Sequence, residues 1–222
     1  MEFLFIRLIV FICGIKIRTM SDRKRKAALF VNAAVIVFEL YALSRTFFFM
    51  NGFFDISAFQ FYTNDSNIFA LVSSVLYAVS SLNGKKTGVR LRFMATSSLT
   101  LTFLVVICVL IPLEKESASY LLFDRACFFE HLVCPILSFV SFVFFEDGSA
   151  LTRKDALSAV LPTAVYASIM IILNMVRVVE GPYPFLRVCE QPLYMSVIWF
   201  FVIFGGDYLI SRGILFLAKR QR

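Results

Sequence analysis

Six long apolar runs, separated by short charged segments, constrain the fold of this chain more than any other feature of its sequence. They cover residues 27–48, 61–82, 92–113, 120–145, 156–178 and 193–217. A helix needs about 20 apolar residues to cross a hydrocarbon core of ~30 Å, and in lipid only helices and closed barrels satisfy their own backbone groups. The pattern therefore predicts an all-α, polytopic membrane protein with six transmembrane helices.

The composition excludes the main alternatives to a membrane protein. Of the 222 residues, 59% are hydrophobic and 17% are charged, so a soluble domain of this length would lack polar residues for its surface. The net charge of +7 does not indicate a nucleic-acid partner, because the basic residues lie in short clusters between the apolar runs, where they would face lipid headgroups. We expect membrane lipids as partners and no nucleic acid.

Basic residues gather in the segments before the first run and after the second, fourth and sixth runs. They are Lys16, Arg18, Arg23, Lys24, Arg25, Lys26, Lys85, Lys86, Arg90, Arg92, Arg153, Lys154, Lys219, Arg220 and Arg222. Segments rich in Lys and Arg stay in the cytoplasm, so both termini are expected there, in a multi-pass protein of the cell membrane.

The N-terminal residues 1–26 are expected to form an interfacial and basic segment ahead of a transmembrane domain over 27–222. Residues 3–15 are apolar but too short to span, and they lack the basic start of a signal peptide. Met20 opens a sequence typical of a cytoplasmic start before a span, so residues 1–19 can also be interpreted as lying outside the native protein.

Ionisable residues inside apolar runs are expensive in lipid and are functional candidates by default. They are Glu39, Glu130, His131, Arg177, Asp207 and Arg212. Glu39, Asp207 and Arg177 could instead pair with one another between helices, and Arg212 is close enough to the end of its run to reach the interface.

His131 is the single histidine of the chain, about two turns into the fourth run. An imidazole can move protons at neutral pH, although a lone histidine in a helix is more often a packing residue. The polar run TNDSN, residues 63–67, opens the second span and could cap that helix or supply a nucleophile. The predicted topology puts this run near His131 in depth. Thr63 and His131 would then be nucleophile and base, with Asn64 and Asn67 as oxyanion donors.

The remaining candidates near the histidine are weaker. Asp65 could orient the imidazole if its side chain turns inward, whereas Glu130 points roughly 100° away around an α-helix. Cys127 and Cys134, at i−4 and i+3 from the histidine, are alternative nucleophiles that are equally typical of helix packing. A disulfide between Cys127 and Cys189 stays open, because both would lie toward the outer side.

The five cysteines show no CxxC spacing. With one histidine and scattered carboxylates, the chain also lacks the usual ligand sets for zinc or iron. No metal or organic cofactor is therefore expected.

Three blocks in this order and spacing resemble the bacterial branch of the androgen-induced-protein family of integral membrane proteins. They are FYTNDSNIFALV, FFEHLVCPILSFVSFVFFE and LPTAVYASIMIILNMVRVVEGPYPFLRV, and the resemblance covers about residues 27–217. Characterised animal members are described as threonine hydrolases that cleave fatty acid esters of hydroxy fatty acids in the membrane. The resemblance puts their threonine and histidine on Thr63 and His131.

The segment GPYPFL, residues 181–186, is similar to a YPFL segment of the family, with no catalytic role implied. Tyr183 and Phe185 are expected to contact substrate, and Arg177 to bind a substrate carboxylate with its paired donors.

The residues and the resemblance together predict an intramembrane lipid-ester hydrolase. The alternative is a small transporter or lipid-binding protein, in which Glu39, Asp207, Arg177 and His131 line a path for a solute or proton. The sequence shows no obvious inverted repeat, which counts against a transporter.

Overall fold

The structure, a computed structural model, describes residues 22–49, 54–83, 88–113 and 118–221. Within these ranges every regular element is a helix. Six helices are long and apolar enough to cross a membrane: Asp22–Phe48, Tyr62–Leu82, Val89–Leu113, Arg125–Phe145, Arg153–Met175 and Leu193–Arg220. They confirm the predicted all-α class and the six spans. The predicted N-terminal segment lies almost entirely outside the described residues.

Several of the long helices contain more than one regular element. In chain order the elements are α2 (Asp22–Ser44), η1 (Arg45–Phe49), η2 (Ile56–Gln60), α3 (Tyr62–Leu82), α4 (Val89–Val105), η3 (Val106–Leu110), α5 (Ile111–Leu113), α6 (Ala118–Phe123), α7 (Arg125–Phe128), η4 (Phe129–Val133), α8 (Cys134–Val140), η5 (Ser141–Phe145), α9 (Arg153–Ser158), α10 (Leu161–Met175), η6 (Pro184–Leu186) and α11 (Leu193–Arg220).

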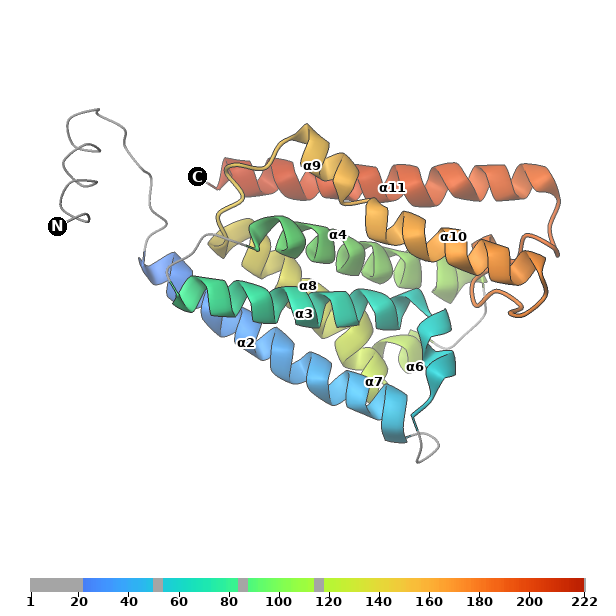
Figure 1. Cartoon of the computed structure of the whole chain (residues 1–222), viewed down its shortest axis with the longest axis horizontal. Helices are drawn as coiled ribbons and strands as arrows, with labels where there is room; N and C mark the ends of the chain where they lie inside the picture. Colours follow the sequence, from blue (N-terminus) through green and yellow to red (C-terminus); the bar gives the residue numbers. More distant parts are fainter. Residues whose placement is uncertain (1–21, 50–53, 84–87, 114–117, 222) are drawn as a thin grey trace.

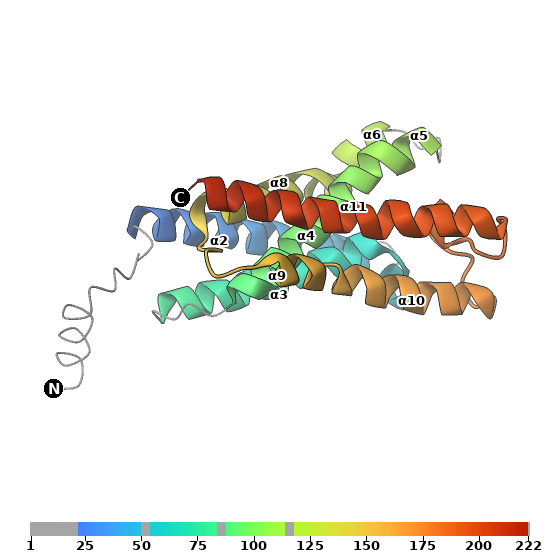
Figure 2. The ribbon, with the colours of Figure 1, turned by 90° about the horizontal axis from the view of Figure 1, so that it is seen from above.

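Helices α3, α4, α10 and α11 lie side by side along one axis of the molecule, and α2 and α8 run obliquely to them (Figure 1). Helix α4 is in contact with α3, α8 and α11, and α2 packs along α3 and α8. Seen from above, α5 and α6 lie together at one side of the bundle (Figure 2). The bundle therefore has α4 near its centre, which brings side chains of α3, α10 and α11 together around it.

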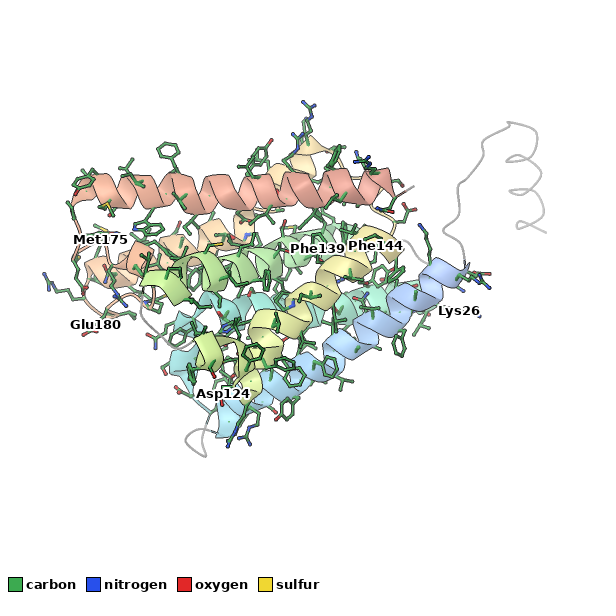
Figure 3. All side chains as sticks on the ribbon, turned by 180° about the vertical axis from the view of Figure 1, so that it is seen from behind. Lys26, Asp124, Phe139, Phe144, Met175 and Glu180 are labelled. Atoms are coloured by element: carbon green, nitrogen blue, oxygen red, sulfur yellow. The ribbon has the colours of Figure 1, made fainter. Side chains whose placement is uncertain are left out.

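Helix α2 begins and α11 ends at the same end of the bundle, which we call the terminal end (Figure 1). Lys24 Nζ donates to the carbonyl oxygen of Gln221 over 3.3 Å, which ties these two helix ends together. Lys26 lies at this end, whereas Asp124 and Glu180 lie at the opposite, distal end (Figure 3). The labelled basic residue and the two labelled acidic residues thus lie at opposite ends of the bundle.

Two π-helical turns each precede a proline. Turn η3 ends two residues before Pro112, and η4 ends two residues before Pro135. Proline has no N–H, and its ring clashes with the carbonyl four residues earlier, so the helix widens locally instead of continuing as a regular α-helix. The turn η4 holds both Glu130 and His131.

The structure moves several predicted helix boundaries: the first span begins at Asp22 and not at residue 27, and two other changes bear on the candidate site. The fourth span begins at Arg125 and not at residue 120, because Asp124 has extended backbone angles (φ −80°, ψ 129°) that separate α6 from α7. The fifth span ends at Met175, so Arg177 lies beyond it in a left-handed conformation (φ 58°). Arg177 therefore follows the spanning helix and does not lie within it, contrary to the expectation from the sequence.

A buried ion pair lies among the helices near the terminal end. Arg92 Nη2 lies 3.2 Å from Glu146 Oε1, and both side chains are fully buried. Ser138 accepts from the same guanidinium over 3.1 Å, and Asn32 donates to Glu146 over 3.0 Å. The pair thus joins α2, α4 and α8 to the residue after η5. Arg92 was expected to face headgroups with the other basic residues, and this expectation was wrong.

Candidate active site

The side chains of Thr63 and His131 meet in the interior of the bundle. Thr63 lies in the first turn of α3, His131 lies in η4, and Oγ1 of Thr63 is 3.2 Å from Nε2 of His131. Both side chains are buried, with 7% and 6% of their surface exposed. The structure thus brings together the two residues that the sequence analysis selected as nucleophile and base.

The backbone of α6 fixes which nitrogen of His131 is basic. Nδ1 of His131 lies 2.6 Å from the carbonyl oxygen of Leu121. A carbonyl oxygen only accepts hydrogen bonds, so Nδ1 must carry the hydrogen of the neutral imidazole. Nε2 then has a lone pair directed at Thr63, and the threonine hydroxyl can donate to it.

Asn67 holds Thr63 and η4 together through their backbones. Its Nδ2 donates to the carbonyl oxygen of Thr63 over 2.7 Å and to that of Glu130 over 3.3 Å. The side chain is fully buried, so these bonds form without competition from water. Asn67 therefore fixes the backbone of α3 against the backbone next to His131.

An apolar cavity of about 140 Å³ opens beside Thr63, between α4, α10 and α11. Its lining extends from Thr163 to Ile171 on α10 and from Ser196 to Phe204 on α11. Eight residue steps at 1.5 Å each give it a length of about 12 Å along these helices. Most of the lining side chains are aliphatic or aromatic, which suits a hydrocarbon chain better than a polar metabolite.

The inner end of the cavity has a polar wall. Thr163 Oγ1 donates to Asp207 Oδ2 over 2.6 Å, and the Tyr62 hydroxyl lies 2.7 Å from Thr163 Oγ1. Because Thr163 has one hydrogen and gives it to Asp207, Tyr62 must be the donor to Thr163. Both hydroxyl hydrogens in this wall are therefore already used.

Tyr183 reaches the site from the segment that joins α10 to α11. Its hydroxyl oxygen lies 3.4 Å from the backbone nitrogen of Thr63 and 3.5 Å from Oγ1 of Thr63. Burial raises the pKa of this phenol above its ordinary value of 10, so the hydroxyl stays protonated at neutral pH. Phe185 and Leu186 of the same segment line the cavity with Tyr183.

The chain matches no protein-family model, no curated protein and no solved structure. The resemblance of its three sequence blocks to the androgen-induced-protein family therefore stays a prediction, and the chemistry of the site is inferred from its own geometry.

The polar run at the start of α3 does not cap that helix. The N-cap residue is Phe61, which makes no side-chain capping bond, and the run lies within the first two turns. Asn64 Nδ2 donates to the carbonyl oxygen of Ala58 over 2.7 Å. Neither Asn64 nor Asn67 lines the cavity, and both have amide hydrogens committed to backbone oxygens. The structure therefore gives these two residues positioning contacts and does not bring them to an oxyanion.

Asp65 and Glu130 do not orient the imidazole. Asp65 is half-buried and lines a separate groove between α3 and α10. Glu130 Oε1 accepts a hydrogen bond from Thr46 over 2.9 Å. The expected role of a carboxylate at Nδ1 is taken by the Leu121 carbonyl, which has no signature in the sequence.

The other intramembrane ionisable residues do not pair with one another. Asp207 bonds to Thr163, and the Glu39 carboxylate lies close to Cys134 and Glu130. Arg177 is exposed and does not line the cavity, so the structure does not bring it to the site as expected. Arg212 Nη1 donates to the Tyr208 hydroxyl over 3.3 Å.

The two cysteines that were alternative nucleophiles do not reach the cavity. Neither Cys127 nor Cys134 contributes to its lining. Cys127 and Cys189 are not joined to each other, and no cysteine within the described ranges forms a disulfide.

Proposed function

We propose that this chain is an intramembrane hydrolase of lipid esters, with Thr63 as nucleophile and His131 as general base. The observation that supports this most is the 3.2 Å contact between the Thr63 hydroxyl and Nε2 of His131. Thr63 lines an apolar cavity, and His131 lies behind it, outside the lining. A hydroxyl is a weak nucleophile until an adjacent base takes its proton, and this arrangement provides the base.

The reaction has two halves. In the first, the Thr63 hydroxyl gives its proton to Nε2 of His131 as Oγ1 bonds to the ester carbonyl carbon, and the carbonyl oxygen becomes an oxyanion. The C–O bond to the alcohol then breaks, and the imidazolium returns the proton to the leaving oxygen. In the second half, water gives a proton to Nε2 of His131 as its oxygen bonds to the acyl carbon. The bond from that carbon to Oγ1 breaks, and the imidazolium returns the proton to Oγ1, which releases a carboxylic acid and restores Thr63.

The cavity gives the acyl chain a place beside the nucleophile. Its length of about 12 Å and its aliphatic and aromatic lining match a hydrocarbon chain that enters from the lipid. The three sequence blocks that resemble the androgen-induced-protein family point to fatty acid esters of hydroxy fatty acids as the substrate class. We propose the cell membrane as the location and membrane lipids as the source of substrate.

Covalent labelling tests the assignment. The purified protein is treated with a long-chain fluorophosphonate, and the modified residue is identified by mass spectrometry. We expect labelling of Thr63, no labelling of the Thr63→Ala variant and much slower labelling of His131→Ala. Thr100→Ala is a matched control, because Thr100 bonds to Thr96 of its own helix and does not line the cavity. Equal labelling of all variants, or none of the wild type, would exclude the hydrolase and favour a transporter or lipid-binding protein.

A further inference from the structure

The segment 181–187 forms a tight turn that carries Tyr183. Gly181 has φ +86°, a left-handed conformation that residues with a side chain rarely adopt. A Cβ atom at this position would lie 3.0 Å from the carbonyl oxygen of Leu186. Arg187 Nε donates to the Gly181 carbonyl over 3.1 Å, and Leu186 N donates to the Tyr183 carbonyl over 2.9 Å. These contacts fix the backbone on both sides of Tyr183.

Helix α10 anchors the same segment. Asn174 Nδ2 donates to the carbonyl oxygens of Val179 and Glu180 over 3.1 and 2.9 Å. Its Oδ1 accepts from the backbone N–H of Cys189 over 3.3 Å. The segment is thus tied to α10 both before and after the turn, which holds Tyr183 in one place relative to the bundle.

Aromatic neighbours fix the ring of Tyr183. It stacks on Phe185, with ring centroids 5.2 Å apart and an interplanar angle of 16°, and meets the edge of Phe61 at 6.5 Å. With its ring held between these neighbours, the hydroxyl has little choice of position. It lies at the start of α3, next to both the backbone nitrogen and the side-chain oxygen of Thr63.

The Tyr183 hydroxyl has one hydrogen to donate and an oxygen that can accept hydrogen bonds. Its oxygen accepts from the Thr63 N–H, so its own hydrogen is not used in that bond. Thr63 directs its hydroxyl hydrogen to Nε2 of His131, so Oγ1 can accept from Tyr183. The Tyr183 hydrogen can therefore point toward the nucleophilic oxygen, which lies 3.5 Å away at the wall of the cavity.

The neighbouring hydroxyls at the inner end of the cavity are committed elsewhere. Tyr62 donates to Thr163, and Thr163 donates to Asp207. Thr102 donates to the backbone oxygen of Ser98 over 3.1 Å. None of these three hydrogens is available to a negative charge that forms beside Thr63.

We infer that Tyr183 is a catalytic residue that donates a hydrogen bond to the oxyanion formed when Thr63 attacks an ester. This inference rests on the proposed function. As Oγ1 bonds to the carbonyl carbon, the electron pair of the C=O bond moves to the carbonyl oxygen, which lies next to Oγ1. The Tyr183 hydrogen then shifts from Oγ1 to that oxygen, and the bond strengthens because its acceptor is now charged.

The first test compares Tyr183→Phe with wild type in the hydrolysis of para-nitrophenyl octanoate. Loss of one oxyanion donor lowers kcat by about 100-fold or more, and we expect KM to change by less than about twofold. An octyl trifluoromethyl ketone, which forms a charged adduct with the nucleophile, is expected to bind the variant more weakly by a similar factor. Tyr77→Phe is the control, since Tyr77 is buried on α3 but does not line the cavity.

A second test keeps the hydroxyl and the shape of the ring, so that folding is not at issue. Ring-fluorinated tyrosine at position 183 is a stronger hydrogen-bond donor, and the affinity for the trifluoromethyl ketone is expected to rise with fluorination. Wild-type kcat in Tyr183→Phe, or affinity independent of fluorination, would overturn the role of Tyr183 while Thr63 labelling still supports the hydrolase. If wild-type Thr63 is not labelled by the fluorophosphonate, both proposals fall.

Discussion

The Nδ1 atom of His131 lies 2.6 Å from the backbone oxygen of Leu121, so a short helix outside the fourth span selects the basic nitrogen of the imidazole. In serine hydrolases of the Ser-His-Asp type a carboxylate performs this task and also stabilises the imidazolium. A carbonyl oxygen orients the ring equally well but carries no charge. The nitrogen of His131 that faces Thr63 is therefore made basic by a neutral backbone hydrogen bond and not by a second ionised group.

This contact predicts the tautomer of His131. Because His131 is the single histidine of the chain, a ¹⁵N-histidine sample reports on this residue alone. We expect the nitrogen spectrum of the neutral ring to show a protonated Nδ1 and an unprotonated Nε2. The opposite assignment would mean that Nε2 cannot accept the Thr63 proton, and the proposed mechanism would fail.

The same site predicts that kcat/KM falls on the acidic side of neutral pH and not on the basic side up to about pH 10. Protonation of His131 removes the base, so kcat/KM should fall tenfold per pH unit below the pKa of the imidazole. The pKa of Tyr183 is raised by burial, so its proton is kept to higher pH than that of a free phenol. No basic limb is therefore expected below pH of about 10. A fall in kcat/KM between neutral pH and this value, absent in Tyr183→Phe, would contradict the protonated phenol.

Asn67→Asp tests the bridge between α3 and η4. The change keeps the shape of the side chain but replaces two N–H donors with an acceptor that faces the carbonyl oxygens of Thr63 and Glu130. We expect kcat to fall by about 100-fold, because a small displacement of Thr63 from His131 spoils proton transfer. Unfolding free energy should fall by about 1–3 kcal/mol.

Asn83→Asp is the matched control for this change. Asn83 makes the same bond to the residue four positions earlier, at the exposed end of α3. The Asn83→Asp variant should keep kcat and the free energy of unfolding close to the wild-type values. A similar kcat in the two variants would show that the bridge does not position Thr63.

Ala167→Phe tests whether the cavity holds the acyl chain. Ala167 lines the cavity from α10, and a phenyl ring there would occupy its volume. The kcat/KM for para-nitrophenyl octanoate should fall by about tenfold or more. Several methylenes of the octanoyl chain would lose their contacts with the cavity, at a cost of ~0.8 kcal/mol each. Hydrolysis of the acetate ester should change much less. Ala164→Phe, on the same helix but outside the lining, is the control, and equal effects in both variants would argue against an acyl site here.

Arg92→Met tests the buried ion pair with Glu146. Removal of one partner leaves a buried charge, and we expect a loss of about 3–5 kcal/mol in unfolding free energy. Arg90→Met is the control on the same helix, because Arg90 is 69% exposed and its ion pair with Asp155 should contribute less than about 1 kcal/mol. Thermal unfolding in detergent measures both. Similar losses would show that the buried pair has no special part in holding the helices.

The sequence predicted the parts of this structure that depend on contact with lipid. Apolar runs of the right length identified all six long helices, because the bilayer imposes the same requirement on each of them. Thr63 and His131 were selected because polar and ionisable groups stand out in such a background, and a family resemblance supported the pair. Their contact is the part of the site that the sequence anticipated.

The remaining contacts depend on backbone geometry or on helix packing, which residue types do not reveal. The Leu121 carbonyl is a backbone acceptor that any residue could supply. Arg92 reads as one more basic residue at a span end, and its burial depends on Glu146 lying opposite. Arg177 follows the last turn of its helix, although apolar residues continue beyond it. In the sequence, the turn that brings Tyr183 to Thr63 is indicated only by a glycine, Gly181, two residues before the tyrosine.

The π-helical turn before Pro135 has a consequence for how two helices are locked together inside the membrane. In an α-helix the carbonyl of Glu130 would accept from the N–H of Cys134, but that N–H bonds to Phe129 instead, and Pro135 has no N–H to offer. The Glu130 carbonyl oxygen is left without a partner in its own helix, in a residue that is 3% exposed, and Asn67 donates a hydrogen bond to it over 3.3 Å. Pro135 thereby leaves a carbonyl oxygen on η4 to which the side-chain amide of Asn67 on α3 donates. Because the same amide also donates to the carbonyl oxygen of Thr63, this bridge helps to fix the distance between Thr63 and His131.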